Sequence, residues 1–327
     1  MMATALFNPM SRSIDRFGFN PLLTNNPSSL NMIRKRPSFS PLLILSLLLF
    51  MSCNNTATSS NEEQTIAYTD DYGTQVNVPT HPQRIVSTSP AVTEIIFALG
   101  GENLLVGRTD FCVYPPEVAE IESIGGISNL NIERIMSLNP DLVISGSMIP
   151  KKSTLQMEKM GVPTVCVIEK QHYDGLYENI SKIGLLIGRT EAADSLNQLL
   201  RKQLAALDVP TVSKPKEVYY VVGFGAAGNF TAGGDSFIND IIQLAGGHNI
   251  AEEATGWSYS LENLLQQNPE YIIIRKEDSA AFCNMPPYTQ LEAVKKGKVI
   301  AIESSLIDLQ IPRNIEAIQF LFDRLHR

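Results

Sequence analysis

The sequence is poor in the side chains that hold transition metals and has no excess of positive charge. It contains four cysteines and four histidines in 327 residues, without the Cys-x-x-Cys or His-x-x-x-His spacing of zinc sites. Acidic residues outnumber basic ones by 34 to 26, and the formal net charge is −8. A nucleic-acid partner would need a basic face. We therefore expect no bound metal and no nucleic-acid partner.

Catalytic motifs are missing as well. The sequence has no glycine-rich phosphate-binding loop, no nucleophile elbow and no recognisable Ser-His-Asp arrangement. We therefore expect no catalytic residues, no resident cofactor and no enzymatic activity.

Long hydrophobic runs are also absent, and the longest apolar stretch, residues 42–51, is too short to span a bilayer. The basic residues 34–36 precede it, and Ser52-Cys53 follows it. This order is typical of a lipoprotein signal that is cleaved before an acylated cysteine. Residues 1–53 are thus a predicted signal region, with Met32 as the expected true start and Cys53 as the lipidation site. Residues 54–65 are a predicted flexible spacer.

Two segments in the two halves of the chain carry nearly the same pattern. Residues 131–144 and 260–273 each contain a polar helix cap, a glutamate, a short amphipathic helix, an Asn-Pro pair and an apolar strand. Residues 94–103 and 240–249 form a second pair, in which a helix ends at two glycines. The repeat predicts two similar lobes, and a cleft between two lobes is a common binding site.

Alternating strand and helix patterns predict an α/β fold with a mainly parallel sheet in each lobe. A hairpin is expected at residues 66–78. Predicted strands lie at residues 84–87, 104–106, 142–145, 164–167, 218–222, 271–274 and 299–302. Predicted helices begin at Ser89-Pro90 and cover residues 115–120, 132–138, 153–160, 174–187, 190–207 and 314–325. The resulting domains are a first lobe (66–172), linker helices (173–214) that include a long bridging helix, and a second lobe (215–327).

The order of these parts, together with a set of short sequence motifs, matches a known family of proteins. The motifs are residues 82–87 with Glu94 and 99–100, residues 131–144, residues 231–234 with 246–250, and residues 312–313. This arrangement resembles the helical-backbone substrate-binding proteins of ABC importers, which serve vitamin B12, haem and iron-siderophore uptake. The resemblance covers everything after Ile66. Residues 114–116, Tyr-Pro-Pro, and Trp257 favour the vitamin B12-binding branch, although Ile127 and Ser145 stand near places where that branch has other aromatics. The resemblance implies a ligand cleft between the lobes.

Candidate site residues come from the resemblance and from loops that follow strands, where parallel sheets bind ligands. The candidates for ligand binding are Ser89, Phe111, Tyr114, Ser145, Phe224, Trp257 and Tyr259. Glu133 and Glu262 lie in the first turn of one helix in each lobe. The helix dipole favours a carboxylate there in any protein, and the resemblance adds a role in docking on arginines of the permease.

Other polar residues leave further hypotheses open. Cys112 and Cys283 could bind a metal centre or form a disulfide across the cleft, although a free cysteine is usually a small buried apolar residue. With Cys166, three cysteines remain after lipidation, so at most one disulfide can form. His172 could bind haem iron, but it could equally cap a helix or face solvent. Residues 275–276 and Arg313 could contact an anionic ligand.

We therefore expect a monomeric, exported and membrane-tethered lipoprotein, in the periplasm or on the outer face of the cell membrane. It would deliver a metal-containing ligand to an ABC permease and its ATPase. Cobalamin or a related corrinoid is the first choice, followed by haem or an iron-siderophore. One alternative is an exported metallochelatase-like enzyme, for which His172 would be the candidate histidine. Another is a surface lipoprotein that scavenges the ligand without docking on a permease.

Overall fold

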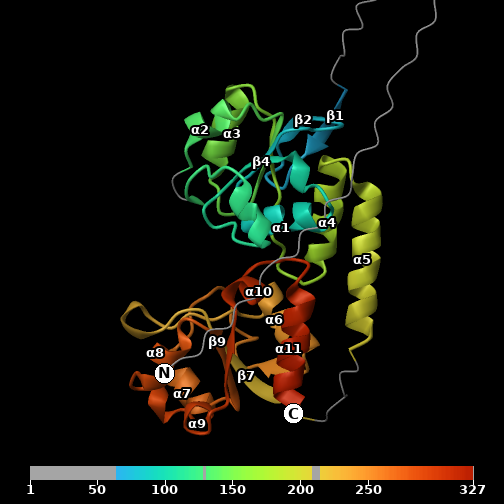
Figure 1. Ribbon diagram of the computed structural model, residues 1–327. Coiled ribbons are helices and arrows are strands. Elements are labelled where there is room, and N and C mark those ends of the chain that lie inside the picture. Colours follow the sequence, from blue (N-terminus) through green and yellow to red (C-terminus); the bar gives the residue numbers. More distant parts are fainter. Residues whose placement is uncertain (1–63, 128–129, 208–213, 327) are drawn as a thin grey trace, which may run out of the picture. The chain divides into compact units, whose positions relative to one another are not determined.

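The computed structural model describes residues 64–127, 130–207 and 214–326. The predicted signal region, Cys53 and most of the predicted spacer lie outside the described residues. The described residues fall in one compact unit, in which two lobes are visible in Figure 1. Within this part of the chain, no helix is long and apolar enough to cross a membrane.

The first lobe is built on a four-stranded parallel sheet. Its order is β4-β3-β5-β6, with β3 at Ile85–Ser87, β4 at Leu105–Arg108, β5 at Leu142–Ser145 and β6 at Thr164–Cys166. The helices of this lobe are α1 (Pro90–Ala98), α2 (Ile132–Ser137) and α3 (Lys151–Lys159), with short 3₁₀ helices at Glu102–Leu104 and Pro116–Glu120. An antiparallel hairpin, β1 (Thr65–Thr69) and β2 (Gln75–Pro79), precedes them, as predicted.

The second lobe repeats this plan. Its parallel sheet has the order β10-β9-β7-β8, with β7 at Lys216–Val221, β8 at Gly247–Asn249, β9 at Tyr271–Arg275 and β10 at Val299–Ile302. Its helices are α6 (Phe237–Leu244), α7 (Leu261–Gln267), α8 (Ser279–Asn284), α9 (Glu292–Lys295), α10 (Ser304–Asp308) and α11 (Asn314–His326), with 3₁₀ helices at Gly225–Ala227 and Tyr288–Gln290. The predicted α/β fold with two similar lobes is confirmed.

Two helices connect the lobes. α4 (Gly175–Leu186) packs against α1, and α5 (Thr190–Ala205) packs against both α4 and α11. Figure 1 shows α5 running alongside both lobes, as the sequence predicted for a bridging helix. One cluster of buried apolar side chains includes Ile144 of the first sheet, Ile180 of α4 and Ile273 of the second sheet. The linker helices therefore share one hydrophobic core with both lobes.

The internal repeat is visible in the backbone. The side chains of Asn131 and Ser260 cap α2 and α7 by accepting hydrogen bonds from backbone N–H groups one turn later. Each helix is followed by an asparagine with a φ of 46°, Asn139 and Asn268. Asparagine tolerates this left-handed conformation better than most residues. The proline after each asparagine then leads into a buried strand.

The second pair of repeated segments also matches. Ser89 and Ser236 cap α1 and α6, and the helices are followed by Gly100 and Gly246 with φ angles of 67° and 79°. A positive φ of this size favours glycine. The repeated sequence therefore encodes the same start and end for each helix.

Candidate ligand-binding cleft

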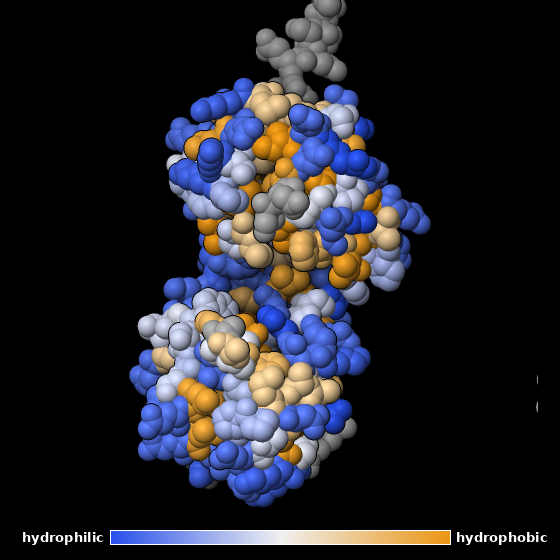
Figure 2. Space-filling model, turned by 90° about the vertical axis from the view of Figure 1, so that its left-hand side faces the viewer, coloured by the Kyte–Doolittle hydropathy of each residue, from blue (hydrophilic) through white to orange (hydrophobic). Residues whose placement is uncertain are grey.

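A cavity of about 540 Å³ lies between the two lobes. In the first lobe, its wall is formed by segments that follow the four parallel strands, and in the second lobe by segments that follow β9 and β10. Its position beyond the carboxyl ends of the strands agrees with the general rule for ligand sites in parallel sheets. Figure 2 shows hydrophobic residues exposed on both lobes near the cleft.

The first-lobe wall is largely apolar. Phe111, Val113 and Met148 line the cavity although they are 59%, 70% and 71% exposed, and the buried Ile127 lies in the same wall. Large apolar side chains that are so exposed and gathered on one concave surface mark a binding site. A ligand with a broad apolar face would gain about 25 cal/mol for each Å² of such surface that it covers.

Polar groups at the same wall come from the start of α1 and from the loop after β5. Ser89 caps α1 by accepting a hydrogen bond from the Val92 N–H. The Thr88 side chain is 1% exposed, and its Oγ1 atom has no hydrogen-bond partner among the described residues. Ser147 donates a short hydrogen bond to the Glu169 carboxylate. The unpartnered hydroxyl of Thr88 is costly unless a ligand or a water molecule bonds to it.

The second-lobe wall is more polar and carries an ion pair. The Nε of Arg275 donates to Oδ2 of Asp308 at 2.7 Å, and the hydroxyl of Tyr220 donates to Oδ1 of the same carboxylate. Burial raises the pKa of Asp308, and the hydrogen bonds from Tyr220 and Arg275 oppose that shift. Ser304 and Ser305 of α10 and the exposed Glu277 complete this wall.

Two of the predicted ligand-binding residues, Ser89 and Phe111, line the cavity. Tyr114 lies at the contact between the lobes instead, where the Arg313 guanidinium stands 3.5 Å from its ring centre. Ser145 is fully buried at the end of β5, and its hydroxyl donates to the Val165 carbonyl.

The other three predicted residues belong to the second lobe and are not among the residues that line the cavity. Phe224 packs edge-on against Phe282 and Tyr288. Tyr259 packs against Tyr219, and Trp257 is 51% exposed. The structure therefore does not bring these three aromatics together with Phe111.

Sequence reasoning missed several residues of the cleft, including Thr88, Met148, Glu169 and Glu277. Glu169 follows β6 and Glu277 follows β9, each by two or three residues. The rule that ligands bind beyond the ends of parallel strands identifies both positions, because each carboxylate stands in the segment directly after a strand.

The structure also bears on the two hypotheses for the cysteines, a disulfide and a metal centre. Cys112, Cys166 and Cys283 are all free, so the suggested disulfide between Cys112 and Cys283 is wrong. Cys112 is buried, and its Sγ lies 3.2 Å from Oγ1 of Thr93. Among the described residues, no group of three histidine, cysteine or acidic side chains could hold a metal ion.

His172, Arg313 and Arg275 were the other polar candidates for ligand contacts, and their surroundings differ. His172 is 73% exposed, and its Nδ1 lies 3.5 Å from Asp240. Arg313 is paired with Glu94, whereas Arg275 lines the cavity.

Two parallel α/β lobes, a long connecting helix and a cleft at the strand ends define a two-lobed solute-binding protein. The chain belongs to the periplasmic binding protein family, whose model matches residues 85–306. This confirms the resemblance that the sequence indicated.

Individual relatives agree with this assignment. The chain is 28% identical over 309 residues to YvrC, an ABC transporter substrate-binding lipoprotein of Bacillus subtilis, with 90% of this chain and 98% of YvrC covered. It is also 28% identical to a cobalamin-binding protein of Halobacterium salinarum, over 79% of this chain and 73% of that protein. The fold matches the crystal structure of the periplasmic haem-binding protein HutB of Vibrio cholerae with a TM-score of 0.68, at 24% identity, over 75% of this chain and 99% of HutB.

Proposed function

We propose that this protein is the lipid-anchored solute-binding component of an ABC importer, and that it captures cobalamin or a related corrinoid in the cleft. The observation that carries the proposal is the cavity between the lobes, with Phe111, Val113 and Met148 exposed on one wall. Such a wall suits the flat apolar face of a macrocycle, and hydroxyl and charged groups around it suit a polar rim.

The similarity to a cobalamin-binding protein over most of both chains supports this choice of ligand. The fold shared with a haem-binding protein favours haem as the second candidate. Iron-siderophores remain the third member of the same class of metal chelates.

The predicted partners follow from the same proposal. An ABC permease and its ATPase would receive the ligand, and Glu133 and Glu262 would dock the two lobes on the permease. Both side chains are exposed in the first turns of α2 and α7. Exposed charges of this kind steer association and fix its register.

The lipid anchor at Cys53 has its own test. Cys53→Ser should yield a protein that carries no palmitate label and retains its signal region. Normal processing together with incorporation of labelled palmitate into this variant would refute the anchor without affecting the ligand proposal.

The ligand proposal is tested by titrating the purified full-length protein in detergent with cyanocobalamin, haemin and a ferric siderophore. Binding of cyanocobalamin with a shifted absorption spectrum and a calorimetric Kd in the micromolar range or below is the expected result. Selective binding of haemin or the siderophore would replace the corrinoid with that ligand, and binding of none of the three would overturn the proposal.

A further inference from the structure

The side chains that line the cleft carry more negative than positive charge. The charged ones are Arg275, Glu169, Glu277 and Asp308. Arg275 and Asp308 satisfy each other through the 2.7 Å hydrogen bond described above, and Tyr220 bonds to the second oxygen of Asp308. The charge of this pair is therefore compensated within the protein, whereas two carboxylates, Glu169 and Glu277, are left over.

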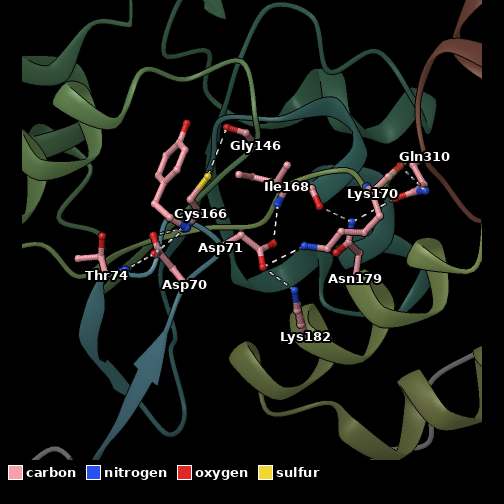
Figure 3. Close-up of polar contacts among 11 residues, drawn as sticks. Asp70, Asp71, Thr74, Gly146, Cys166, Ile168, Lys170, Asn179, Lys182 and Gln310 are labelled. Carbon is pink, nitrogen blue, oxygen red and sulfur yellow. Dashed lines mark hydrogen bonds and ion pairs between the residues drawn. The ribbon is translucent and has the colours of Figure 1, made fainter. Parts of the chain in front are cut away.

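Neither of these carboxylates forms a salt bridge in the part of the chain that the structure describes. The lysine next to Glu169 is Lys170, whose Nζ lies 3.1 Å from the Asp71 carboxylate, as Figure 3 shows. The lysine next to Glu277 is Lys276, whose Nζ lies 2.9 Å from Glu303. The ammonium group of each neighbouring lysine thus forms its ion pair with a carboxylate other than Glu169 or Glu277.

The two carboxylates lie on opposite walls of the cleft. Glu169 follows the last strand of the first sheet and accepts a hydrogen bond from Ser147, and Glu277 follows β9 of the second sheet. A ligand held between the lobes would therefore meet negative charge from both. Thr88 lines the same cavity, and its buried hydroxyl has no hydrogen-bond partner among the described residues. A polar ligand group that reached this hydroxyl would remove the cost of leaving it unpaired.

We infer that the cleft selects macrocycles whose rims carry neutral hydrogen-bond donors, such as carboxamides, and disfavours the same macrocycles when their rims carry free carboxylates. Glu169 and Glu277 are the residues that make this selection. The inference rests on the proposed function, because it takes the ligand to be a metal macrocycle bound in this cleft.

The proposed selection depends on hydrogen bonds between the carboxylates of the protein and donors of the ligand. An ionised carboxylate only accepts hydrogen bonds, so the N–H groups of a carboxamide can bond to it. A ligand carboxylate at the same place would bring two negative charges together in a partly desolvated cleft, and such juxtaposition is strongly unfavourable.

The test compares two matched pairs of ligands on the full-length protein in detergent. The first pair is dicyanocobinamide, with carboxamide side chains, and dicyanocobyrinic acid, with carboxylic acid side chains. The second pair is the diamide of haemin and haemin itself. Calorimetry should give the carboxamide member of the binding pair an affinity higher by about tenfold or more, which corresponds to about 1.4 kcal/mol.

The variant Glu169→Gln/Glu277→Gln should reduce this preference to about threefold or less, mainly by improving the binding of the carboxylate ligand. The matched control is Glu292→Gln, which removes one carboxylate from α9, away from the cavity lining, and should leave the preference unchanged. Raising the salt concentration should also reduce the preference of the parent protein.

The outcomes separate the inference from the proposed function. If corrinoids bind and the carboxylate form binds equally well or better, the inference is overturned and the corrinoid proposal stands. If only the haem pair binds and the diamide is preferred, the inference stands and the corrinoid proposal falls. A preference that persists unchanged in the double glutamine variant removes Glu169 and Glu277 from the selection, and binding of neither pair overturns both ideas.

Discussion

Arg313 and Glu94 form a bidentate ion pair that joins the two lobes. Nε of Arg313 donates to Oε1 of Glu94 at 2.9 Å, and Nη2 of Arg313 donates to Oε2 at 2.8 Å. Both side chains are largely buried, and the guanidinium also stacks on the ring of Tyr114. Burial raises the pKa of Glu94, and the hydrogen bonds from Arg313 oppose that shift. The pair therefore fixes α1 of the first lobe to the start of α11 in the second.

We predict that Arg313→Ala lowers the free energy of unfolding by about 3 to 5 kcal/mol, because it leaves the buried Glu94 carboxylate without its partner. Urea denaturation measures this loss. The double variant Glu94→Gln/Arg313→Met should recover a large part of it, since no unpaired charge remains. Equal losses in the single and double variants would contradict the role of the unpaired charge.

The equivalent position of the repeat ties the second lobe to the start of the linker helices. Asp240 of α6 corresponds to Glu94 of α1, and its Oδ2 accepts a hydrogen bond from the backbone N–H of Tyr173 at 2.8 Å. Each lobe thus uses the same acidic position of its repeated helix to hold a residue from beyond that lobe. The repeat in the sequence predicted the two helices but not these contacts, because the partners Arg313 and Tyr173 lie outside the repeated segments.

A second prediction concerns Asp71, at the tip of the β1-β2 hairpin. Its carboxylate accepts hydrogen bonds from the Lys182 ammonium at 2.6 Å and the Ile168 N–H at 2.8 Å, and lies 3.1 Å from Nζ of Lys170 (Figure 3). Although burial acts to raise its pKa, these donors lower the pKa of Asp71 below its ordinary value of 3.8. A depressed carboxyl pKa stabilises the folded state above the ordinary value, and this stabilisation is lost as the pH falls through the folded-state pKa.

Asp71→Asn should therefore lower the free energy of unfolding by about 1 to 3 kcal/mol at pH 7. The difference from the parent should shrink as the pH falls below 3.8. Chemical denaturation across this range measures both effects. Asp194→Asn, at an exposed position of α5, is the control and should change little. A difference that stays constant with pH would show that the charge of Asp71 contributes nothing.

A third prediction separates the two aromatic candidates for the ligand platform. Phe111 lines the cavity, whereas Trp257 is half exposed and is not among the lining residues. Phe111→Ala should weaken cyanocobalamin binding by roughly 1 to 3 kcal/mol, as expected for the loss of a large aromatic contact. Trp257→Ala should have a smaller effect if the ligand stays within this cavity. Calorimetry on both variants decides, and the reverse order would restore Trp257 as the main platform.

The cysteines provide a fourth prediction. Burial raises the pKa of the Cys166 thiol to about 11, and Cys166 and Cys112 are almost completely buried. Cys283 is partly exposed. Because the thiolate is the reactive form and must be reached by the reagent, iodoacetamide at pH 8 should alkylate Cys283 well before the other two. Peptide mass spectrometry gives the order, and in urea the three rates should become similar. Fast labelling of Cys166 in the native protein would contradict its burial.

The fold was largely predictable because its strong signals are local. The serine and asparagine caps, the Asn-Pro pairs and the glycines after α1 and α6 each set a backbone conformation that depends on a few neighbouring residues. Strand β8 was missed, because its residues Gly-His-Asn have low strand propensity. It pairs with β7 because Gly247 allows the close approach to Ile242 and Val218 that a side chain would hinder.

The site was less predictable, because it depends on contacts between distant segments. Tyr114 was expected in the cleft, but the stacking of Arg313 on its ring holds it at the lobe contact. Ser145 ends a strand, as the rule for parallel sheets requires, yet its side chain is buried, because this parallel sheet is covered on both faces and all four residues of β5 are buried. The sequence shows which strand ends meet, but the direction of each side chain depends on the packing around it.

The last prediction separates ligand binding from delivery. Glu133 and Glu262 are exposed at the starts of α2 and α7, neither residue lines the cavity, and neither forms an ion pair among the described residues. The variant Glu133→Ala/Glu262→Ala should therefore bind ligand as the parent does but fail to support uptake through its permease. Single variants should be partly active, because each lobe provides one contact.

The alternative is a purely structural role, in which each glutamate only interacts favourably with the dipole of its helix. Such an interaction stabilises a helix by about 0.3 to 1 kcal/mol. Loss of both glutamates would then lower stability slightly and leave uptake intact. The matched control is Glu292→Ala, which removes a first-turn glutamate from α9 and should not affect uptake. Because exposed charge pairs are screened by salt, binding of the parent to the permease should weaken as ionic strength rises, and that dependence should be smaller for the double variant. Full uptake by the double variant would exclude docking through these residues, and lost ligand binding would place them in the ligand site instead.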